Sequence, residues 1–153
     1  MYEIYCDGAT SGNGKEDAPG GWSYVILKDG SLVSKNSGGE KGTTNQRMEL
    51  TAAIKACEEL EKMDSTANVD IYSDSAYLTN CFLQSWWEKW QNNGWRNSKK
   101  EPVANQDLWE KLIPFFMKKP QYNFIKVRGH AGNLWNEEVD KMAVRAKESV
   151  IQW

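Results

Sequence analysis

The 153-residue sequence predicts an α/β fold built on a five-stranded mixed sheet, an antiparallel meander of three strands plus two parallel strands. Three observations lead to this prediction. Two runs with strand character flank the pair Asp29-Gly30, which is a strong hairpin signal. The longest helical pattern of the chain follows over residues 43–63. Two short strand-like runs, at 69–74 and 122–127, then alternate with helical segments, as in other α/β chains.

The first part of the chain predicts the antiparallel meander. In residues 2–7, Ile4 and Cys6 alternate with Tyr5 and Asp7, and this period of two predicts the first strand. Residues 9–21 are rich in small residues, Gly and Pro, and are expected to form a loop. Residues 22–28 and 32–37 are the second and third expected strands, joined by a tight turn.

The helix expected over residues 43–63 carries a carboxylate in an unusual place. Thr43 followed by Gln46 is a capping-box arrangement that marks the start of the helix. The apolar positions behind it are Ala52, Ala53, Ala56, Cys57, Leu60 and Met63, and the charged positions on the opposite side are Lys55, Glu58, Glu59 and Lys62. At roughly 100° per residue, Glu49 projects into the middle of the apolar face. An ionised carboxylate there costs on the order of several kcal/mol unless it is paired, so we expect a cation or a basic side chain beside it.

The remainder of the chain completes the order βββαβαααβα. The expected segments are a strand at 69–74, a short helix at 75–83, a Trp-rich stretch at 85–103, a helix at 105–117, a strand at 122–127, a loop at 128–132 and an amphipathic helix at 133–150. Asn105 is expected to cap the helix at 105–117. Pro114 is expected to kink or shorten that helix, because proline removes a backbone donor.

Length and composition indicate one domain over residues 1–153. Hydrophobic residues make up 40% and charged residues 26%, which argues against disorder, and no apolar run approaches the roughly 18 residues of a membrane span. Residues 1–7 lack the features of a signal peptide.

Cys6, Cys57 and Cys81 are widely spaced without a CxxC motif, which favours a reducing cytoplasm over disulfides or zinc. A net charge of −2 gives no general attraction to nucleic acid, so basic residues that bind it must be concentrated locally.

Four carboxylates predict a divalent-metal site. Asp7 and Asp74 each lie at the carboxyl end of an expected strand, where ligands bind in open α/β sheets. Glu49 lies near the start of its helix, and Asp140 lies at the shoulder of the apolar stripe of the last helix. Clustered carboxylates repel one another, and oxygen-only ligands suit Mg²⁺ or Mn²⁺. Two such ions roughly 3.5–4 Å apart are the usual apparatus of in-line phosphoryl displacement, which points to a metal-dependent nuclease.

Three of these four residues also have a purely structural interpretation. Asp7 before a glycine is typical of a turn, Asp74 before a serine could cap the next helix, and Asp140 could be a solvated shoulder residue. Glu49 on an apolar helix face has no comparable structural explanation. The joint pattern therefore favours the metal site over four separate accidents.

Four segments together carry a resemblance to a known family. They are Tyr5-Cys6-Asp7-Gly8, Thr44-Asn45-Gln46-Arg47-Met48-Glu49-Leu50, Tyr72-Ser73-Asp74-Ser75, and Gly129-His130-Ala131-Gly132 with Asn136-Glu137 and Asp140. Through them the chain resembles the type I ribonuclease H family over nearly its whole length. The resemblance implies a ribonuclease H-like fold with helices on both faces of the sheet. It also implies endonucleolytic cleavage of the RNA strand of an RNA–DNA hybrid.

The resemblance assigns the metal ligands and the mechanism. Asp7, Glu49, Asp74 and Asp140 match the family's ligands for two Mg²⁺ ions, with Mn²⁺ as an alternative. One ion would activate the attacking water and the other would stabilise the departing 3′ oxygen, which leaves 5′-phosphate and 3′-hydroxyl ends. His130, the single histidine, matches a residue that assists proton transfer or product release, and we assign it an accessory catalytic role.

The Trp-rich stretch at 85–103 has two interpretations. In the first, its tryptophans pack against the helix that carries Trp109. In the second, aromatic and basic side chains together grip nucleic acid, with Trp90 and Trp95 as contacts, as in the family's basic protrusion. The neutral amides at 91–93 replace a basic cluster common in relatives. We therefore expect weaker hybrid affinity and a shallower salt dependence than a strongly basic protrusion gives.

Further substrate contacts follow from the resemblance. Asn13, Asn45, Gln46 and Asn136 are the expected contacts to the hybrid, and Thr44 and Asn105 are expected to hold a phosphate of the DNA strand. Contacts to the 2′-hydroxyl would distinguish RNA from DNA. The chain departs from the family in a longer 11–21 loop and in Ala76, where many relatives have a longer polar residue.

Three functions remain open from the sequence. The leading one is a stand-alone, monomeric ribonuclease H that acts on replication primers or R-loops without a membrane or a protein partner. The starting methionine and the terminal helix favour it over the ribonuclease H domain of a reverse transcriptase. A hybrid-binding module without activity is the non-enzymatic alternative. The four carboxylates argue against that alternative, because a mere binder gains nothing from negative charge near phosphates.

Overall fold

The computed structural model describes residues 1–12, 17–118, 122–127 and 133–151. The strands are β1 (Tyr2–Thr10), β2 (Pro19–Lys28), β3 (Ser31–Lys41), β4 (Val69–Ser73) and β5 (Tyr122–Lys126). The helices are α1 (Asn45–Met63), α2 (Ala76–Leu83), α3 (Trp86–Asn92), α4 (Gln106–Lys118) and α5 (Leu134–Ile151). This sequence of elements confirms the predicted order.

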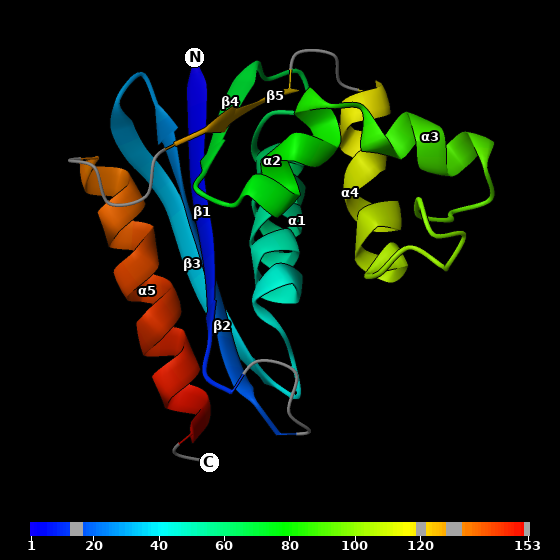
Figure 1. Ribbon diagram of the computed structural model, residues 1–153. Helices are drawn as coiled ribbons and strands as arrows, with labels where there is room; N and C mark the ends of the chain where they lie inside the picture. Colours follow the sequence, from blue (N-terminus) through cyan, green and yellow to red (C-terminus); the bar gives the residue numbers. More distant parts are fainter. Residues whose placement is uncertain (13–16, 119–121, 128–132, 152–153) are drawn as a thin grey trace.

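The sheet has the strand order β3-β2-β1-β4-β5 (Figure 1). Strands β1, β2 and β3 pair antiparallel, and β4 pairs parallel with both β1 and β5. The predicted mixed sheet is therefore confirmed. At the β2–β3 hairpin, Asp29 and Gly30 have φ values of 50° and 84°, the mirror-image turn that an Asp-Gly pair favours.

Helices cover both faces of the sheet, α1 on one side and α5 on the other (Figure 1). Since successive side chains of a strand point to opposite faces, β1 contributes to two cores. Ile4 and Cys6 belong to the large core beneath α1, whereas Tyr5 packs with Val25 and Val139 beneath α5. The same alternation continues along β1. Asp7 lies on the same face of the sheet as Tyr5, and Gly8 lies on the same face as Cys6.

The first two strands are longer than the sequence predicts. Strand β1 continues to Thr10 and β2 begins at Pro19, so much of the expected 9–21 loop is paired sheet. Gly20 and Gly21, which suggested a loop, serve close packing instead. A Cβ on Gly21 would lie 2.1 Å from the backbone oxygen of Ala143, so α5 packs directly on the β2 backbone.

Two expectations about helix ends meet different outcomes. The expected cap was wrong, because the N-cap of α1 is Thr44 and not Thr43, and its hydroxyl accepts a hydrogen bond from the Arg47 backbone at 3.1 Å. Helix α4 continues through Pro114 to Lys118, so the proline does not shorten it, and the alternative of a kink stays a prediction. The carbonyl that Pro114 leaves without a helical donor belongs to Glu110, an exposed residue.

Helices α2, α3 and α4 form a protrusion held by aromatic side chains. Phe82 of α2 stacks 4.5 Å from Phe124 of β5, and Trp90 of α3 lies 5.4 Å from Trp109 of α4, both measured between ring centroids. The predicted packing of the Trp-rich stretch against Trp109 is confirmed. Trp109 itself is fully buried, so the protrusion is anchored in the main core.

Among the described residues, no helix is long and apolar enough to cross a lipid bilayer. Cys6, Cys57 and Cys81 are each buried as free thiols.

The contact at Gly21 gives a first testable prediction. Gly21→Ala places a methyl group against the α5 backbone, and we expect it to lower the free energy of unfolding by about 1–3 kcal/mol. Urea unfolding followed by circular dichroism measures the change. Ser37→Ala, at an exposed position of the neighbouring strand β3, is the control and should change stability by less than about 0.5 kcal/mol. An equally small effect of Gly21→Ala would contradict the proposed close packing.

Candidate active site

Gly8 brings Glu49 beside Asp7. Asp7 is 4% exposed and lies within β1, not in the turn that its sequence context suggested. Gly8 faces α1, and a Cβ there would lie 2.6 Å from the backbone nitrogen of Glu49. The missing side chain therefore lets the start of α1 touch the β1 backbone. Glu49, the fifth residue of α1, is placed next to Asp7, the residue that precedes Gly8.

Asp74 lies at the corner between β4 and α2. Ser75 caps α2, because its hydroxyl accepts a hydrogen bond from the Leu78 backbone at 3.1 Å, so the alternative of Asp74 as the cap is wrong. The Ser75 backbone donates in turn to the Ser73 hydroxyl at 3.1 Å. These two serines fix the corner around Asp74. Because β1 and β4 run parallel as neighbours, Asp74 emerges at the same edge of the sheet as Asp7.

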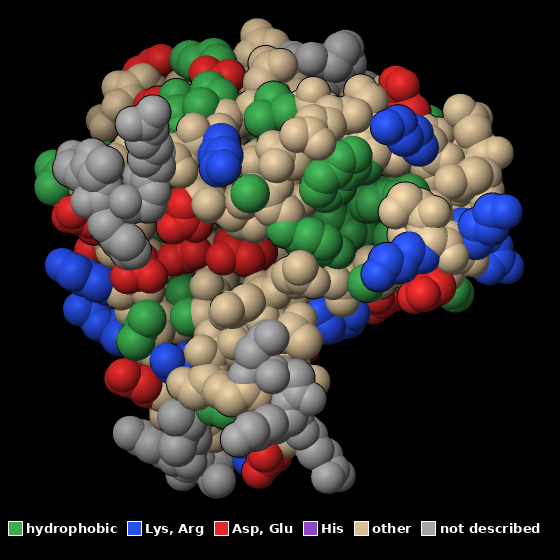
Figure 2. Space-filling model, viewed as in Figure 1, with side chains coloured by type: hydrophobic (Ala, Val, Ile, Leu, Met, Phe, Trp, Pro, Cys, Tyr) green, Lys and Arg blue, Asp and Glu red, His purple; other side chains and the backbone are tan. Residues whose placement is uncertain are grey.

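Three carboxylates converge at this edge. One ligand oxygen from each of Asp7, Glu49 and Asp74 lies within 4.8 Å of the others. They line an open groove of about 380 Å³. Its other lining residues are Gly8, Asn45, Gln46, Ser75 and Asp140. Figure 2 shows acidic side chains gathered on this face beside an apolar area, with basic side chains farther out over α3.

Asp140 approaches the same group from α5. It lines the same groove, and its side chain contributes to the raised pKa of Asp7. Helix α5 is held in place by Ser23, which lies directly opposite Asp7 on β2 and whose buried hydroxyl donates to the carbonyl of Val139. The helix position is therefore tied to the strand pair that carries Asp7. No sequence pattern indicates this role of Ser23, because a serine in a strand carries no pattern of its own.

Burial and like charge raise the pKa values of the Asp7 and Glu49 carboxyl groups. Burial is the largest cause for Asp7, followed by the charge of Asp74, and together with the Asp140 contact they raise the pKa of Asp7 to about 8. Burial, followed by the charges of Asp7 and Asp74, raises the pKa of Glu49 well above its ordinary value. Hydrogen bonds from the Gly8 backbone act in the opposite direction on both groups.

These residues fit a divalent cation. The buried Oε2 atom of Glu49 has no hydrogen-bond partner within the described parts of the chain. A buried oxygen without a donor is costly, and a cation held between the three carboxylates would satisfy it. The donors are all carboxylate oxygens, the ligands that hard divalent cations prefer.

Polar side chains at the start of α1 border the carboxylates. Asn45 and Gln46 are exposed and line the groove. The Thr10 hydroxyl donates to Oδ1 of Asn45 at 2.9 Å, which orients that amide. Thr44 caps α1, as described above. The structure thus gathers the predicted contacts Thr44, Asn45 and Gln46 at one end of α1.

The remaining predicted substrate contacts have different fates. Asn105 lies directly before α4, where its carbonyl accepts from two backbone nitrogens of that helix, and its side chain contacts Arg47 and Tyr77. Asn136 is 1% exposed, so it would have to move to touch a nucleic acid on the surface. Asn13 and His130 lie outside the described residues.

The two predicted tryptophan contacts lie on the protrusion. Trp90 and Trp95 are half-buried, with their ring centroids 5.8 Å apart. Trp90 lines a surface hollow of about 380 Å³ together with Trp86, Lys89, Asn93, Arg96, Asn97 and Ser98. The two interpretations of this stretch are therefore compatible, since one side of the cluster packs on Trp109 and another remains accessible.

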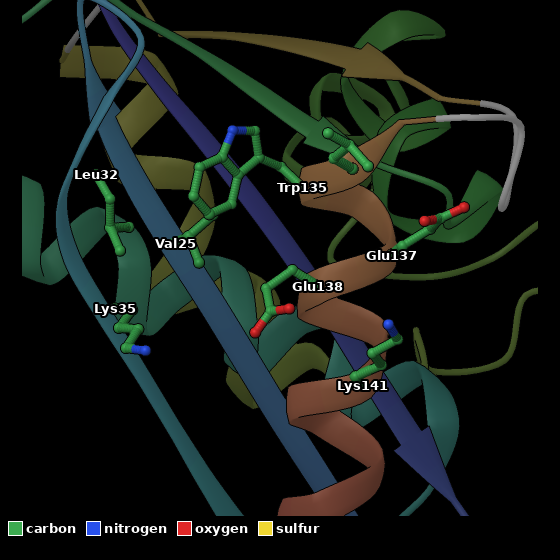
Figure 3. A pocket seen from close by; sticks show the side chains of 8 residues that line it. Val25, Leu32, Lys35, Trp135, Glu137, Glu138 and Lys141 are labelled. Carbon is green, nitrogen blue, oxygen red and sulfur yellow. The ribbon is translucent and has the colours of Figure 1, made fainter.

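A larger hollow of about 480 Å³ lies between β2, β3 and the first turns of α5 (Figure 3). Trp135 lies over Val25 at its base, and side chains of both charges, Lys35, Glu137, Glu138 and Lys141, surround it. The carboxylates described above do not line it. Its mixed charge and apolar base provide no constellation that favours one ligand.

The chain matches the model of one protein family and is similar to curated relatives. The family model of RNase H matches residues 1–148. The Ribonuclease H of Syntrophomonas wolfei subsp. wolfei is 48% identical over 147 residues, which are 96% of this chain and 96% of the relative. The Ribonuclease H of Caldanaerobacter subterraneus subsp. tengcongensis is 48% identical over 144 residues, which are 94% of this chain and 88% of the relative.

Solved structures show the same architecture. LC9-RNase H1, a type 1 RNase H with the type 2 active-site motif, has a TM-score of 0.82 at 26% identity, with coverage of 97% of this chain and 72% of that one. LC11-RNase H1, solved in complex with RNA/DNA hybrid, has a TM-score of 0.75 at 22% identity and covers 99% of both chains. The latter likeness concerns the fold alone.

The raised pKa of Asp7 gives a prediction for the metal-free protein. The carboxyl ionises near 3.8 in the unfolded chain and near 8 in the folded one, so the folded state holds the proton more tightly. The stability that this group contributes is present below about pH 4 and is lost as the pH rises through about 8. Asp7→Asn should therefore flatten the fall of Tm between pH 5 and 8 and raise Tm at pH 8.

Thermal unfolding in the presence of a chelator measures this effect. Glu58→Gln removes an exposed carboxyl group on the same domain and should leave the pH dependence as it is. If Asp7→Asn retains the wild-type slope of Tm against pH, the carboxyl group does not titrate as described.

Proposed function

Because this chain belongs to the ribonuclease H family, we propose that it is an endonuclease that hydrolyses the RNA strand of RNA–DNA hybrids. The observation that carries the proposal is the convergence of Asp7, Glu49 and Asp74 in one open groove. The same groove is lined by Asn45 and Gln46, so acidic and polar groups suited to catalysis and to recognition share one surface. The products would carry 5′-phosphate and 3′-hydroxyl ends.

Two Mg²⁺ ions, with Mn²⁺ as a substitute, are the proposed cofactors. Asp7, Glu49, Asp74 and Asp140 would hold them. When bound, such ions lower the pKa of a coordinated water and neutralise charge on the leaving oxygen. The chain itself contributes the fixed positions of the four carboxylates, and the raised pKa values of Asp7 and Glu49 reflect how much negative charge the fold concentrates there.

The polar residues of the groove are the proposed recognition elements. Asn45 and Gln46 are placed to exchange hydrogen bonds with the sugar and base edges of the RNA strand, where a 2′-hydroxyl distinguishes RNA from DNA. Thr44 and Asn105 are proposed to hold a phosphate of the DNA strand. His130 is proposed to assist proton transfer or product release. Asn13 is proposed to contact the hybrid.

The protrusion is proposed to bind the DNA strand. Trp86 and Trp90 offer aromatic surface, and Lys89 and Arg96 border the same hollow. The neighbouring Asn93 side chain is engaged with the backbone of Arg96, so it shapes the turn and adds no charge. We expect moderate affinity from this surface.

The proposed setting is a monomer that works in the cytoplasm as a single catalytic domain without a protein partner. The buried free thiols of Cys6, Cys57 and Cys81 support a reducing compartment. A ribonuclease H domain of a reverse transcriptase would place the same site in a larger enzyme. A binding module without activity would leave the three converging carboxylates without a purpose.

A cleavage assay tests the proposal. A labelled RNA of about 20 nucleotides annealed to DNA should be cut internally with Mg²⁺ and not with chelator, and RNA–RNA and DNA–DNA duplexes should remain intact. Asp74→Asn should lower kcat at least about 100-fold, because it removes one of three charges around the proposed ions. Equal cutting of all duplexes would refute hybrid specificity, metal-independent cutting would refute the mechanism, and binding without any cutting would favour the binding module.

The protrusion predicts a specific salt dependence. Lys89→Ala should weaken hybrid binding and reduce the slope of log Kd against log salt concentration by about one, the effect of one lost phosphate contact. Fluorescence anisotropy at several salt concentrations measures both quantities. Lys62→Ala, in the last turn of α1, is the charge-matched control. Identical slopes for the two variants would place the DNA strand elsewhere.

A further inference from the structure

One side chain joins the start of α1 to the start of α4. The Arg47 guanidinium donates to both carboxylate oxygens of Asp107, at 3.0 Å and 2.8 Å. The same guanidinium donates to Oδ1 of Asn105 at 3.3 Å. Two parallel bonds to one carboxylate fix the plane of the guanidinium, so its third bond has a defined direction as well.

The other end of the Asn105 amide is held by Tyr77. Nδ2 of Asn105 donates to the Tyr77 hydroxyl at 3.1 Å. That hydroxyl is itself fixed, because Nε1 of Trp109 donates to it at 3.0 Å and it donates to the carbonyl of Ala104 at 3.4 Å. The amide is thus oriented from both ends, with its oxygen toward Arg47 and its nitrogen toward Tyr77.

The backbone of Asn105 has a φ of 61°, a left-handed conformation that few residues other than glycine adopt. Asparagine tolerates this conformation better than most residues. The Asn105 carbonyl accepts from the backbone nitrogens of Leu108 and Trp109 at 3.0 Å and 3.1 Å, so the backbone serves the start of α4. The side-chain amide is directed to Arg47 and Tyr77.

Thr44 depends on the same arginine. Its hydroxyl oxygen accepts from the Arg47 backbone nitrogen at 3.1 Å, so its hydrogen remains available for donation. The Asn105 amide has a second hydrogen besides the one that it donates to Tyr77. Both donors proposed for the DNA phosphate are therefore positioned through contacts with Arg47, while Asp107 balances the charge of the guanidinium.

We propose that Arg47 and Tyr77 are positioning residues for the DNA strand, which fix the Asn105 amide so that its second hydrogen meets a phosphate oxygen. The inference rests on the proposed function, because it concerns the hybrid as ligand. It differs from a purely stabilising role of these contacts in one respect. Loss of either contact should weaken one particular phosphate interaction, and should leave the chemistry at the carboxylates unaffected.

Binding measurements with modified hybrids test the inference. The probes are RNA–DNA hybrids of about 20 base pairs in which one DNA phosphate at a time is replaced by a neutral methylphosphonate. The hybrids are kept uncut by the Asp74→Asn substitution, so the result does not depend on cleavage. The modification at the contacted phosphate should raise Kd about tenfold, the usual effect of a lost hydrogen bond to a charged group.

Two variants then separate positioning from stability. In Tyr77→Phe and Arg47→Lys, Kd for the unmodified hybrid should rise about three- to tenfold and the methylphosphonate at that position should have less than twofold effect. Tyr122→Phe is the control, because it removes a buried hydroxyl from the hydrophobic core against which Tyr77 packs. This variant should keep the full tenfold penalty. With Asp74 intact, both variants should raise KM and leave kcat within about twofold.

The outcomes are distinct. A full penalty at the same phosphate in Tyr77→Phe and Arg47→Lys would overturn the inference, as would a loss of kcat at unchanged KM. A wild-type chain that binds hybrids but shows no penalty at any position would overturn it too. Failure to cut any hybrid would refute the proposed activity alone, because the binding penalties are measured without cleavage.

Discussion

The repulsion among three carboxylates held close together is the constraint that organises this molecule. Asp7 and Glu49 have raised pKa values because they are buried and because they face further negative charge. Such a group spreads apart unless its supports are rigid. Here the supports are backbone contacts: Gly8 lets α1 touch β1, and the parallel pairing of β1 with β4 fixes the edge from which Asp74 emerges. The frame holds the charges at short range, and a divalent cation is the partner that makes such an arrangement favourable.

The two faces of the sheet contribute different parts of the site. Glu49 comes from α1 on one face, and Asp140 comes from α5 on the other. Asp7 lies on the strand between them, within reach of both. Recognition is arranged in the same divided manner, since the start of α1 supplies Asn45 and Gln46 while the protrusion provides a separate surface beside Trp90. Arg47 connects those two surfaces through its contacts with Asp107 and Asn105. The chemistry and the grip on substrate are thus built on one continuous frame.

The order of elements and the four acidic positions could be predicted because both leave periodic or local signals. Glu49 stood out by its place on an apolar helix face, and the structure puts it beside Asp7 and Asp74. Element boundaries were less predictable where a residue serves a tertiary contact. Gly21 has the signature of a loop residue, but it lies in a strand because α5 packs against its backbone. Ser23 and Tyr77 could not be recognised at all, since their importance comes from partners 116 and 28 residues away.

The attachment of α5 has a consequence for the order in which the molecule becomes complete. During synthesis, Asp7, Glu49 and Asp74 leave the ribosome well before residues 134–151. Three of the four carboxylates are therefore synthesised before the helix that carries the fourth. Asp140 reaches the groove only when α5 docks on Gly21 and Ser23, so the acidic site is completed by the last helix of the fold.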